Sequence, residues 1–266
     1  MIKKNILLVS DENYLTHGKI LLKSLFLNTN NFRVHYFIIT DKKELSLDKV
    51  FYNKNIFLYY KKKAGKNNQE IKAYFANSRI EFCKELFLNN DLNHLMYLDV
   101  DSILIKDITK LYNSFLRQKE ILQIRKRDTK NVKNKFMTGI FLLKKNQEFI
   151  NLWIKNLENK KFKWFGDQIS VYETLRNKKF KNLTIDLPFE YIDFRLSDKS
   201  YIWSGRSGTK NYYKYKLEKF LINHLYKKSK KKKFIDDFFI KKILYKFLDY
   251  YDQKFTKKFS FLFNKD

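Results

Sequence analysis

Short apolar runs that end in polar or acidic residues alternate with helical patterns, and this alternation constrains the fold most strongly. The run Ile6 to Val9 ends in Ser10-Asp11-Glu12-Asn13, and apolar residues then recur at helical spacing over 14–27. The same reading predicts further strands at 34–39, 55–60, 94–98, 121–124, 139–143 and 183–187, and further helices at 69–88 (interrupted or extended near Ala76-Asn77), 147–159 and 167–177. This order predicts an α/β fold with a mostly parallel central sheet flanked by helices.

Length and cysteine content restrict the organisation further. The 266 residues, 44% of them hydrophobic, suffice for one large domain, or one domain with an appendage. The single cysteine, Cys83, excludes an intrachain disulfide and a thiolate metal cluster. The run 6–9 is too short for a signal-peptide core, and no stretch approaches the ~20 apolar residues of a membrane span. We expect a cytoplasmic protein, or one bound peripherally to the cytoplasmic face of a membrane.

The formal charge of +28 favours anionic partners such as nucleic acid, anionic lipid or phosphorylated substrates. Lys, Asn, Ile and Phe are abundant throughout, whereas the chain has one proline and six glycines. A general drift in residue usage is therefore an alternative explanation for part of the charge.

Two carboxylates, Asp99 and Asp101, follow the predicted strand His94 to Leu98 directly. On an extended backbone, side chains two residues apart project to the same side, so both acids can reach one cation. Hard divalent cations are held by few carboxylates together with substrate phosphates. Taken alone, the pair is equally compatible with helix capping or with solvated acids.

Two enzymatic hypotheses compete for this pair. In the first, a metal ion on Asp99 and Asp101 neutralises the diphosphate of a nucleotide-sugar. The second is a haloacid-dehalogenase-type phosphatase in which Asp99 is the nucleophile and Asp101 the acid/base. The motif lies about a hundred residues into this chain, whereas it usually begins that family's sequences, so we rank the phosphatase second.

The chain resembles the retaining glycosyltransferases of family 8, the lipopolysaccharide galactosyl- and glucosyltransferase and glycogenin type. Four blocks carry the resemblance in the family's order: LLVSDENYL (7–15), a helix over 73–79 leading into LMYLDVDSILIKDI (95–108), FMTGIFLLKK (136–145), and WFGDQISVYETL (164–175). Each block is weak alone, but their order and spacing over residues 1 to about 225 make the match fairly specific. The resemblance implies a GT-A fold, a Rossmann-like sheet with one active cleft.

The resemblance also implies roles for individual residues. Asp99 and Asp101 correspond to ligands of Mn²⁺ or Mg²⁺, and Asp167 and Gln168 to the pair beside the donor sugar. Residues implied to bind the nucleotide-sugar are Ser10, Asp11, Asn13, Tyr14, Arg79, Asp99, Val100, Gly205, Gly208 and Lys210. Apart from the resemblance, each of these residues has a structural explanation. Tyr14 would pack on the first helix, and Arg79 would be one more exposed base in a cationic chain. Gly166-Asp167 would form the N-cap of a helix.

The chain departs from the family's pattern at the third metal ligand. The family has a His-x-x-Gly-x-x-Lys segment late in the domain, and aligning IWSGRSGTKN (202–211) on Lys210 puts Ser204 at the His position. A Ser hydroxyl, water or His224 are the alternatives for that ligand. The small and basic residues of this segment suit a phosphate. Met137 stands where the family usually has Asn in the third block. Because that block lines the sugar pocket, the resemblance does not imply which donor sugar this chain uses.

The composition changes after Tyr226, where the basic block Lys227 to Lys233 precedes apolar residues at helical spacing from Phe234. We expect a catalytic domain over 1–225 and a basic amphipathic helical tail over 226–266. The tail fits attachment to an anionic membrane surface, with packing on the domain as the alternative and nucleic-acid binding ranked lowest.

The sequence thus predicts a metal-dependent retaining hexosyltransferase that uses a nucleotide-sugar, UDP-linked, and a surface-glycan or lipid-linked acceptor of lipopolysaccharide or capsule synthesis. The non-enzymatic alternative is a basic membrane- or nucleic-acid-binding protein on a degenerate transferase scaffold.

Overall fold

The structure is a computed structural model, and it describes residues 3–205 and 207–228. The predicted helical stripe from Phe234 lies outside these residues. The strands are β1 (Lys4–Asp11), β2 (Phe32–Ile39), β3 (Ile56–Lys61), β4 (His94–Leu98), β5 (Ser102–Leu104), β6 (Leu122–Lys126), β7 (Phe136–Lys144), β8 (Thr184–Asp186) and β9 (Ile202–Ser204). The α-helices are α1 (Leu15–Asn28), α2 (Asn68–Asn77), α3 (Arg79–Asn89), α4 (Thr109–Arg117), α5 (Gln147–Leu157), α6 (Gly166–Arg176) and α7 (Tyr213–Lys228).

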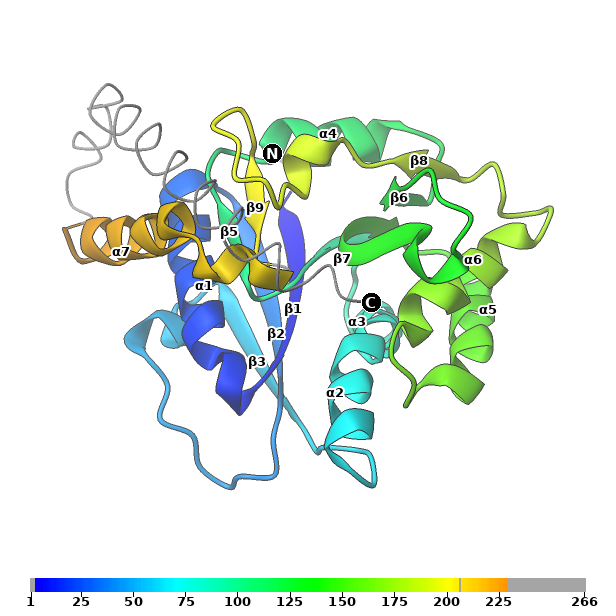
Figure 1. The fold of residues 1–266 in the computed structure, drawn as a ribbon, viewed down its shortest axis with the longest axis horizontal. Helices are drawn as coiled ribbons and strands as arrows, with labels where there is room; N and C mark the ends of the chain where they lie inside the picture. The colour runs from blue at the N-terminus through cyan, green and yellow to red at the C-terminus, as the bar shows by residue number, and fades with distance from the viewer. Residues whose placement is uncertain (1–2, 206, 229–266) are drawn as a thin grey trace, which may run out of the picture.

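A seven-stranded sheet in the order β3-β2-β1-β4-β7-β6-β8 forms the centre of the molecule (Figure 1). Neighbouring strands pair in parallel except at β7, which is antiparallel to both β4 and β6. The sheet is therefore mostly parallel, as predicted. The carboxyl ends of β1 and β4 lie side by side, which brings the two acid-containing segments of the sequence to one edge.

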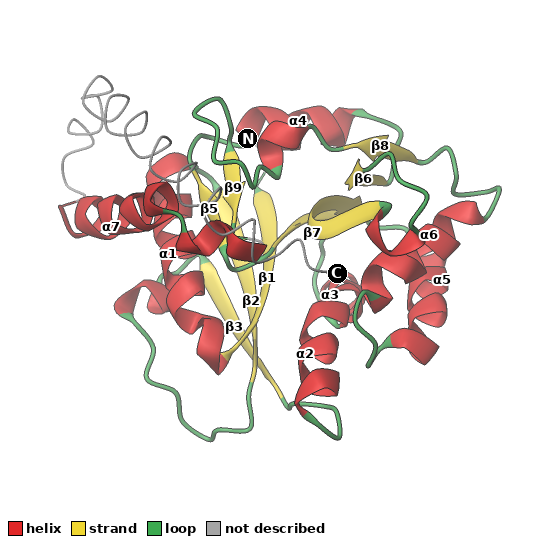
Figure 2. Ribbon diagram, viewed as in Figure 1, coloured by secondary structure: helices red, strands yellow, loops and turns green. Residues whose placement is uncertain are grey.

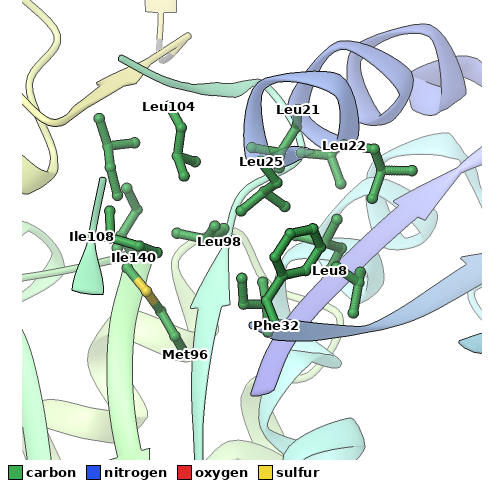
Figure 3. Packing of buried hydrophobic residues seen from close by; sticks show 14 of the residues in the cluster. Leu8, Leu21, Leu22, Leu25, Phe32, Met96, Leu98, Leu104, Ile108 and Ile140 are labelled. Atoms are coloured by element: carbon green, nitrogen blue, oxygen red, sulfur yellow. The ribbon is translucent and has the colours of Figure 1, made fainter. Parts of the chain in front are cut away.

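Each face of the sheet is covered by its own set of helices (Figure 2). Alternate strand residues such as Leu8, Met96 and Leu98 pack with α1 and α4 on one face (Figure 3). Their neighbours Leu7 and Tyr97 pack with α2, α3, α5 and α6 on the other face. Strands buried on both faces explain why the sequence shows continuous apolar runs rather than alternation.

A second, two-stranded sheet pairs β5 with β9 beside the main sheet. Its residues Ile103 and Trp203 form a small core with Ile20 of α1 and Ile222 of α7. Strand β5 begins directly after Asp101. Its pairing with β9 therefore places the acid pair beside the segment that follows β9.

Most predicted elements are confirmed, including the helix interruption, which falls at Ser78 between α2 and α3. The sequence did not predict β5, β9, α4 or α7. Helix α7 crosses residue 226, and its Tyr226 ring lies 6.0 Å from that of Phe26, so the described start of the expected tail packs on α1. In the described part of the chain, no helix has the length and apolar character needed to cross a membrane.

Candidate active site

One cavity of about 420 Å³ lies at the carboxyl end of β4, and five of the site residues expected from the sequence line it: Arg79, Asp99, Asp101, Asp167 and Gln168. Its lining residues come from α2, α3, β7, α6, β9, the turn after β4 and the loops before α6 and β9: Ala76, Arg79, Asp99, Asp101, Met137, Thr138, Gly139, Trp164, Phe165, Asp167, Gln168, Ile192 and Ser204. Three of the four sequence blocks therefore meet around a single space.

A turn, not an extended backbone, aims both acids into this cavity. Ser102 N–H donates to the Asp99 carbonyl oxygen at 2.9 Å and closes the turn directly after β4. Asp99 N–H donates to Gly139 O on β7 at 2.8 Å. A Cβ at Gly139 would lie 2.5 Å from Asp99 Oδ2, so glycine leaves the room that this carboxylate occupies. The expected extended geometry is wrong, but the expected convergence of the two acids is confirmed.

Arg79 is buried and is held in one orientation. Its guanidinium donates to Ala76 O and Thr138 O, both at 2.5 Å. It also lies 3.4 Å from Asp99 Oδ1 and 3.6 Å from Asp167 Oδ2. Burial alone would lower the pKa of Arg79, but the negative groups around it raise it, so the side chain carries a fixed positive charge between two carboxylates.

Asp99 is held by its neighbours while keeping about a third of its side chain open to the cavity. The Tyr97 hydroxyl donates to Asp99 Oδ1 at 2.7 Å. Desolvation by the cavity walls raises the pKa of Asp99 to about 6; Arg79 opposes this rise and Asp101 adds to it. Two ionised acids that line one cavity repel each other, which favours a cation between them.

Asp101 faces the segment after β9. Lys210 Nζ lies 3.0 Å from Asp101 Oδ2 and 4.8 Å from the centre of the Tyr14 ring. The backbone of Asp101 is fixed as well, because Gly205 N–H and the Tyr215 hydroxyl both donate to its carbonyl oxygen. The resemblance led us to expect Lys210 in the site, and the structure brings it there.

Asp167 and Gln168 lie in the first turn of α6 and line the same cavity as the acid pair. Asp167 accepts a hydrogen bond from the Thr138 hydroxyl. The amide group of Gln168 is oriented so that its nitrogen donates to two carbonyl oxygens, Lys133 O at 2.7 Å and Phe136 O at 2.8 Å. The prediction that Gly166-Asp167 caps the helix is wrong: the N-cap is Phe165, and Asn77 Oδ1 accepts from Asp167 N–H at 2.8 Å in place of a local cap.

The residues of the β1 loop occupy less enclosed positions. Asp11 accepts from Tyr14 N–H at 3.0 Å and from Asn13 Nδ2 at 3.3 Å, which fixes the turn into α1. Tyr14 is 40% exposed and Asn13 is exposed. The Ser10 hydroxyl instead hydrogen-bonds with the buried Tyr36 hydroxyl at 2.9 Å, beneath the surface of the site.

The other expected donor-binding residues differ in their placement. The Val100 side chain is buried in the core under α1. A Cβ at Gly205 would lie 2.5 Å from Asp101 O, so glycine is needed for this close backbone approach, whereas Gly208 is exposed with open space around it. Ser204 is buried on β9 and lines the cavity, which agrees with its alignment to the family's histidine.

Sequence reasoning missed three residues that organise the site: Asn77, Thr138 and Trp164. Asn77 and Thr138 lie inside blocks quoted for the resemblance, but they act through partners at least 29 positions away, and no local pattern indicates those partners. Trp164 also lies inside a quoted block. It could have been identified from the sequence as a large aromatic residue directly before the predicted helix that carries Asp167.

The donor set suits a hard divalent cation held in part by its substrate. Asp99 and Asp101 offer carboxylate oxygens to one cavity, and Mg²⁺ is commonly bound by one or two carboxylates with phosphates and water completing the shell. Among the described residues, no group of three or more His, Cys, Asp or Glu side chains is placed to hold a metal ion. The residues therefore fit a two-carboxylate site and not a three-residue protein site.

No family model matches the chain, and no curated protein matches it. Solved glycosyltransferase structures do match. The galactosyltransferase LgtC, solved in complex with donor and acceptor sugar analogues, is 13% identical with a TM-score of 0.56, over 84% of this chain and 95% of LgtC. GlyE of Streptococcus pneumoniae TIGR4 is 18% identical with a TM-score of 0.52, over 86% of this chain and 64% of GlyE.

The bifunctional glycosyltransferase WbbM is 14% identical with a TM-score of 0.53, over 77% of this chain and 46% of WbbM. The chain spans less than two thirds of the length of GlyE and of WbbM. At these identities the likeness concerns the fold, and it agrees with the seven-stranded sheet and its helices. The chain therefore has the GT-A glycosyltransferase fold.

Proposed function

We propose that the chain is a metal-dependent retaining glycosyltransferase of the family 8 type. It transfers a hexose from a nucleotide-sugar, UDP-linked, to a surface-glycan or lipid-linked acceptor at the cytoplasmic face of a membrane. The observation that carries the proposal is the gathering of Asp99, Asp101, Arg79 and the Asp167-Gln168 pair around one cavity on a GT-A fold.

The acid pair accounts for binding of the donor diphosphate. Asp99 and Asp101 would hold Mn²⁺ or Mg²⁺, which supplies a Lewis acid for the charge on the departing phosphate. Lys210, 3.0 Å from Asp101, adds a second positive group on the same side of the cavity. In this arrangement the exposed ring of Tyr14 and the turn fixed by Asp11 flank the nucleotide.

The first turn of α6, which lines the same cavity, accounts for orientation of the sugar. Asp167 is fixed by Thr138 and Arg79, so its carboxylate presents hydrogen-bond acceptors to sugar hydroxyls without rearrangement. When the Gln168 nitrogen is bound to Lys133 O and Phe136 O, its amide oxygen is the atom left for the sugar. A preorganised wall of this kind lowers the entropic cost of reaching the transition state.

A donor screen tests the proposal. The wild-type protein is incubated with UDP-, GDP- and ADP-hexoses, with Mn²⁺ and with EDTA, and release of the nucleotide is measured. We expect hydrolysis of one donor class with Mn²⁺ and its loss with EDTA. Loss of at least 100-fold in the Asp167→Asn variant, with UDP binding retained, would assign that residue to the sugar side.

The same assay separates the alternatives. Hydrolysis of p-nitrophenyl phosphate with no nucleotide-sugar turnover would support the phosphatase. Absence of nucleotide binding together with strong binding to anionic vesicles or RNA would support the non-catalytic scaffold.

A further inference from the structure

A single exposed tryptophan stands at the rim of the cavity. Trp164 lines the cavity and is 60% exposed, whereas Trp153 and Trp203 are fully buried. No described residue hydrogen-bonds its indole N–H. Single exposed aromatic side chains are common on protein surfaces, but this one lines the cavity of the candidate site, so its ring is accessible to a ligand bound there.

The loop that carries Trp164 is anchored from within the protein. The fully buried Asn77 donates from Nδ2 to Lys161 O at 2.7 Å, Lys163 O at 2.9 Å and Lys160 O at 3.2 Å. Its Oδ1 accepts from Asp167 N–H. One side chain therefore ties this loop to the first turn of α6, where the sugar-side carboxylate lies.

The backbone beside Trp164 is strained as well as anchored. Phe165 has φ +64°, a left-handed conformation that a bulky residue rarely adopts and that costs roughly 1 kcal/mol or more. A Cβ at Gly166 would lie 2.3 Å from Lys160 O, so the next residue must be glycine. Strain maintained by such contacts is typical of functional sites, and here it orients adjacent residues toward one cavity.

The position of Trp164 relative to the acid pair indicates which ligand it would contact. It precedes Asp167 and Gln168 in the chain by three and four residues and lines the same cavity, whereas Lys210, which pairs with Asp101 on the proposed diphosphate side, does not line it. A pyranose ring has a C–H face that packs on an aromatic ring and hydroxyls at its edge that hydrogen-bond. An indole with a free N–H offers both kinds of contact.

We propose that Trp164 is the platform on which the acceptor sugar ring stacks, and that Asn77 is the positioning residue that holds this platform in register with Asp167. The inference rests on the proposed glycosyltransferase function and extends it to the acceptor. The proposal thereby makes the acceptor a glycan with a terminal pyranose, whose C–H face packs on the indole.

Intrinsic fluorescence provides a test in the wild-type protein, since Trp164 is the one exposed tryptophan of three. Acrylamide quenching is measured with UDP and Mn²⁺ present, with and without methyl β-galactopyranoside, methyl α-glucopyranoside and methyl α-mannopyranoside. We expect at least one glycoside to protect the exposed indole. If none of the three protects it, the platform is rejected.

Kinetics with the protecting glycoside test the role directly. We expect the Trp164→Ala variant to raise the acceptor KM about 10-fold, a larger change than in the donor KM, and the Trp164→Phe variant to restore most of the affinity. Phe162 is the matched control: it is 42% exposed on the same loop but packs toward Tyr74 and does not line the cavity. Phe162→Ala should leave the acceptor KM unchanged.

An unchanged acceptor KM in Trp164→Ala would overturn the inference. An equal rise in the donor KM would also overturn it, by assigning Trp164 to the donor pocket. For Asn77, the Asn77→Ser variant should raise the acceptor KM and increase acrylamide quenching of Trp164; normal quenching would contradict a positioning role. Failure of the proposed function is distinguishable, because the wild type would then hydrolyse no nucleotide-sugar at all.

Discussion

The two sides of the candidate site are built differently. On the sugar side, Arg79, Thr138 and Asp167 are buried and joined to one another by hydrogen bonds and ion pairs. On the nucleotide side, Tyr14 is 40% exposed, and Lys210 pairs with Asp101 and contacts the ring and the hydroxyl of Tyr14. The comparison indicates that the sugar side is fixed before substrate arrives, whereas the nucleotide side is completed by the substrate.

The largest expected effect follows from removing the charge at the centre of the sugar side. In Arg79→Ala, Asp167 loses its cation in a buried position and Asp99 loses one of its partners, so we expect the free energy of unfolding to fall by about 3–5 kcal/mol in urea denaturation. Arg125→Ala is the control, because its pair with Asp186 is on the surface and should contribute under about 1 kcal/mol. Equal losses in the two variants would contradict a specially rigid sugar side.

The next effect tests the close contact between β7 and the acid pair. In Gly139→Ala the new methyl group would overlap Asp99 Oδ2, so we expect a loss of about 1–3 kcal/mol in unfolding free energy. The loss should shrink when Asp99→Ala is also present, because the second change removes the overlapping carboxylate. A loss of the same size in both backgrounds would show that the clash is not with Asp99.

A smaller effect on stability, but a clear one on binding, is expected on the nucleotide side. In Lys210→Met we expect the affinity for UDP with Mn²⁺ to fall about 10-fold in calorimetry, or ~1.4 kcal/mol, because a cation next to the phosphates is lost. The unfolding free energy should change by less than about 1 kcal/mol, since the pair is partly exposed. Lys216→Met on α7 is the control and should leave both the UDP affinity and the unfolding free energy unchanged. A large loss of unfolding free energy in Lys210→Met but not in the control would contradict the claim that the nucleotide side is less rigid than the sugar side.

The smallest expected effect is a pH dependence. Because the pKa of Asp99 is raised to about 6 in the folded protein, the folded state retains a proton that the unfolded chain has released between about pH 4 and 6. The metal-free protein should therefore lose stability as the pH rises through this window. The side chain is about a third exposed, so we expect a contribution on the order of 1 kcal/mol after screening by solvent.

Urea denaturation of wild type and Asp99→Asn at several pH values between 4 and 7 measures this contribution as the difference between the two proteins. The variant should lack that part of the slope. Parallel stability curves would mean that Asp99 titrates normally.

The sequence predicted the features that depend on local pattern. Buried strands produce continuous apolar runs, so all seven strands of the main sheet were predicted, and the acids that end β1 and β4 followed from them. Strands β5 and β9 have three residues each, too few to produce a periodic signal, and their pairing depends on residues about a hundred positions apart.

The organisation of the site depends on long-range contacts that no local pattern encodes. Asn77 reaches Lys160 and Asp167 across more than 80 positions, and it replaces the helix cap that was wrongly expected at Gly166-Asp167. The acid pair was predicted to converge, but only the structure reveals the turn that brings its members together. The roles implied for the site residues, Ser10, Val100 and Gly208 among them, stay predictions.

Binding of UDP with Mn²⁺ by isothermal calorimetry tests the central claim most directly, because it depends on the acid pair and on no acceptor. The wild type is compared with the double variant Asp99→Asn, Asp101→Asn, and with Glu148→Gln, which changes an exposed carboxylate far from the cavity. We expect metal-dependent binding by the wild type and Glu148→Gln, and a loss of at least about 100-fold, ~2.7 kcal/mol, in the double variant. Equal binding by all three proteins would contradict the assignment of Asp99 and Asp101 as the metal-binding pair of a nucleotide-sugar site.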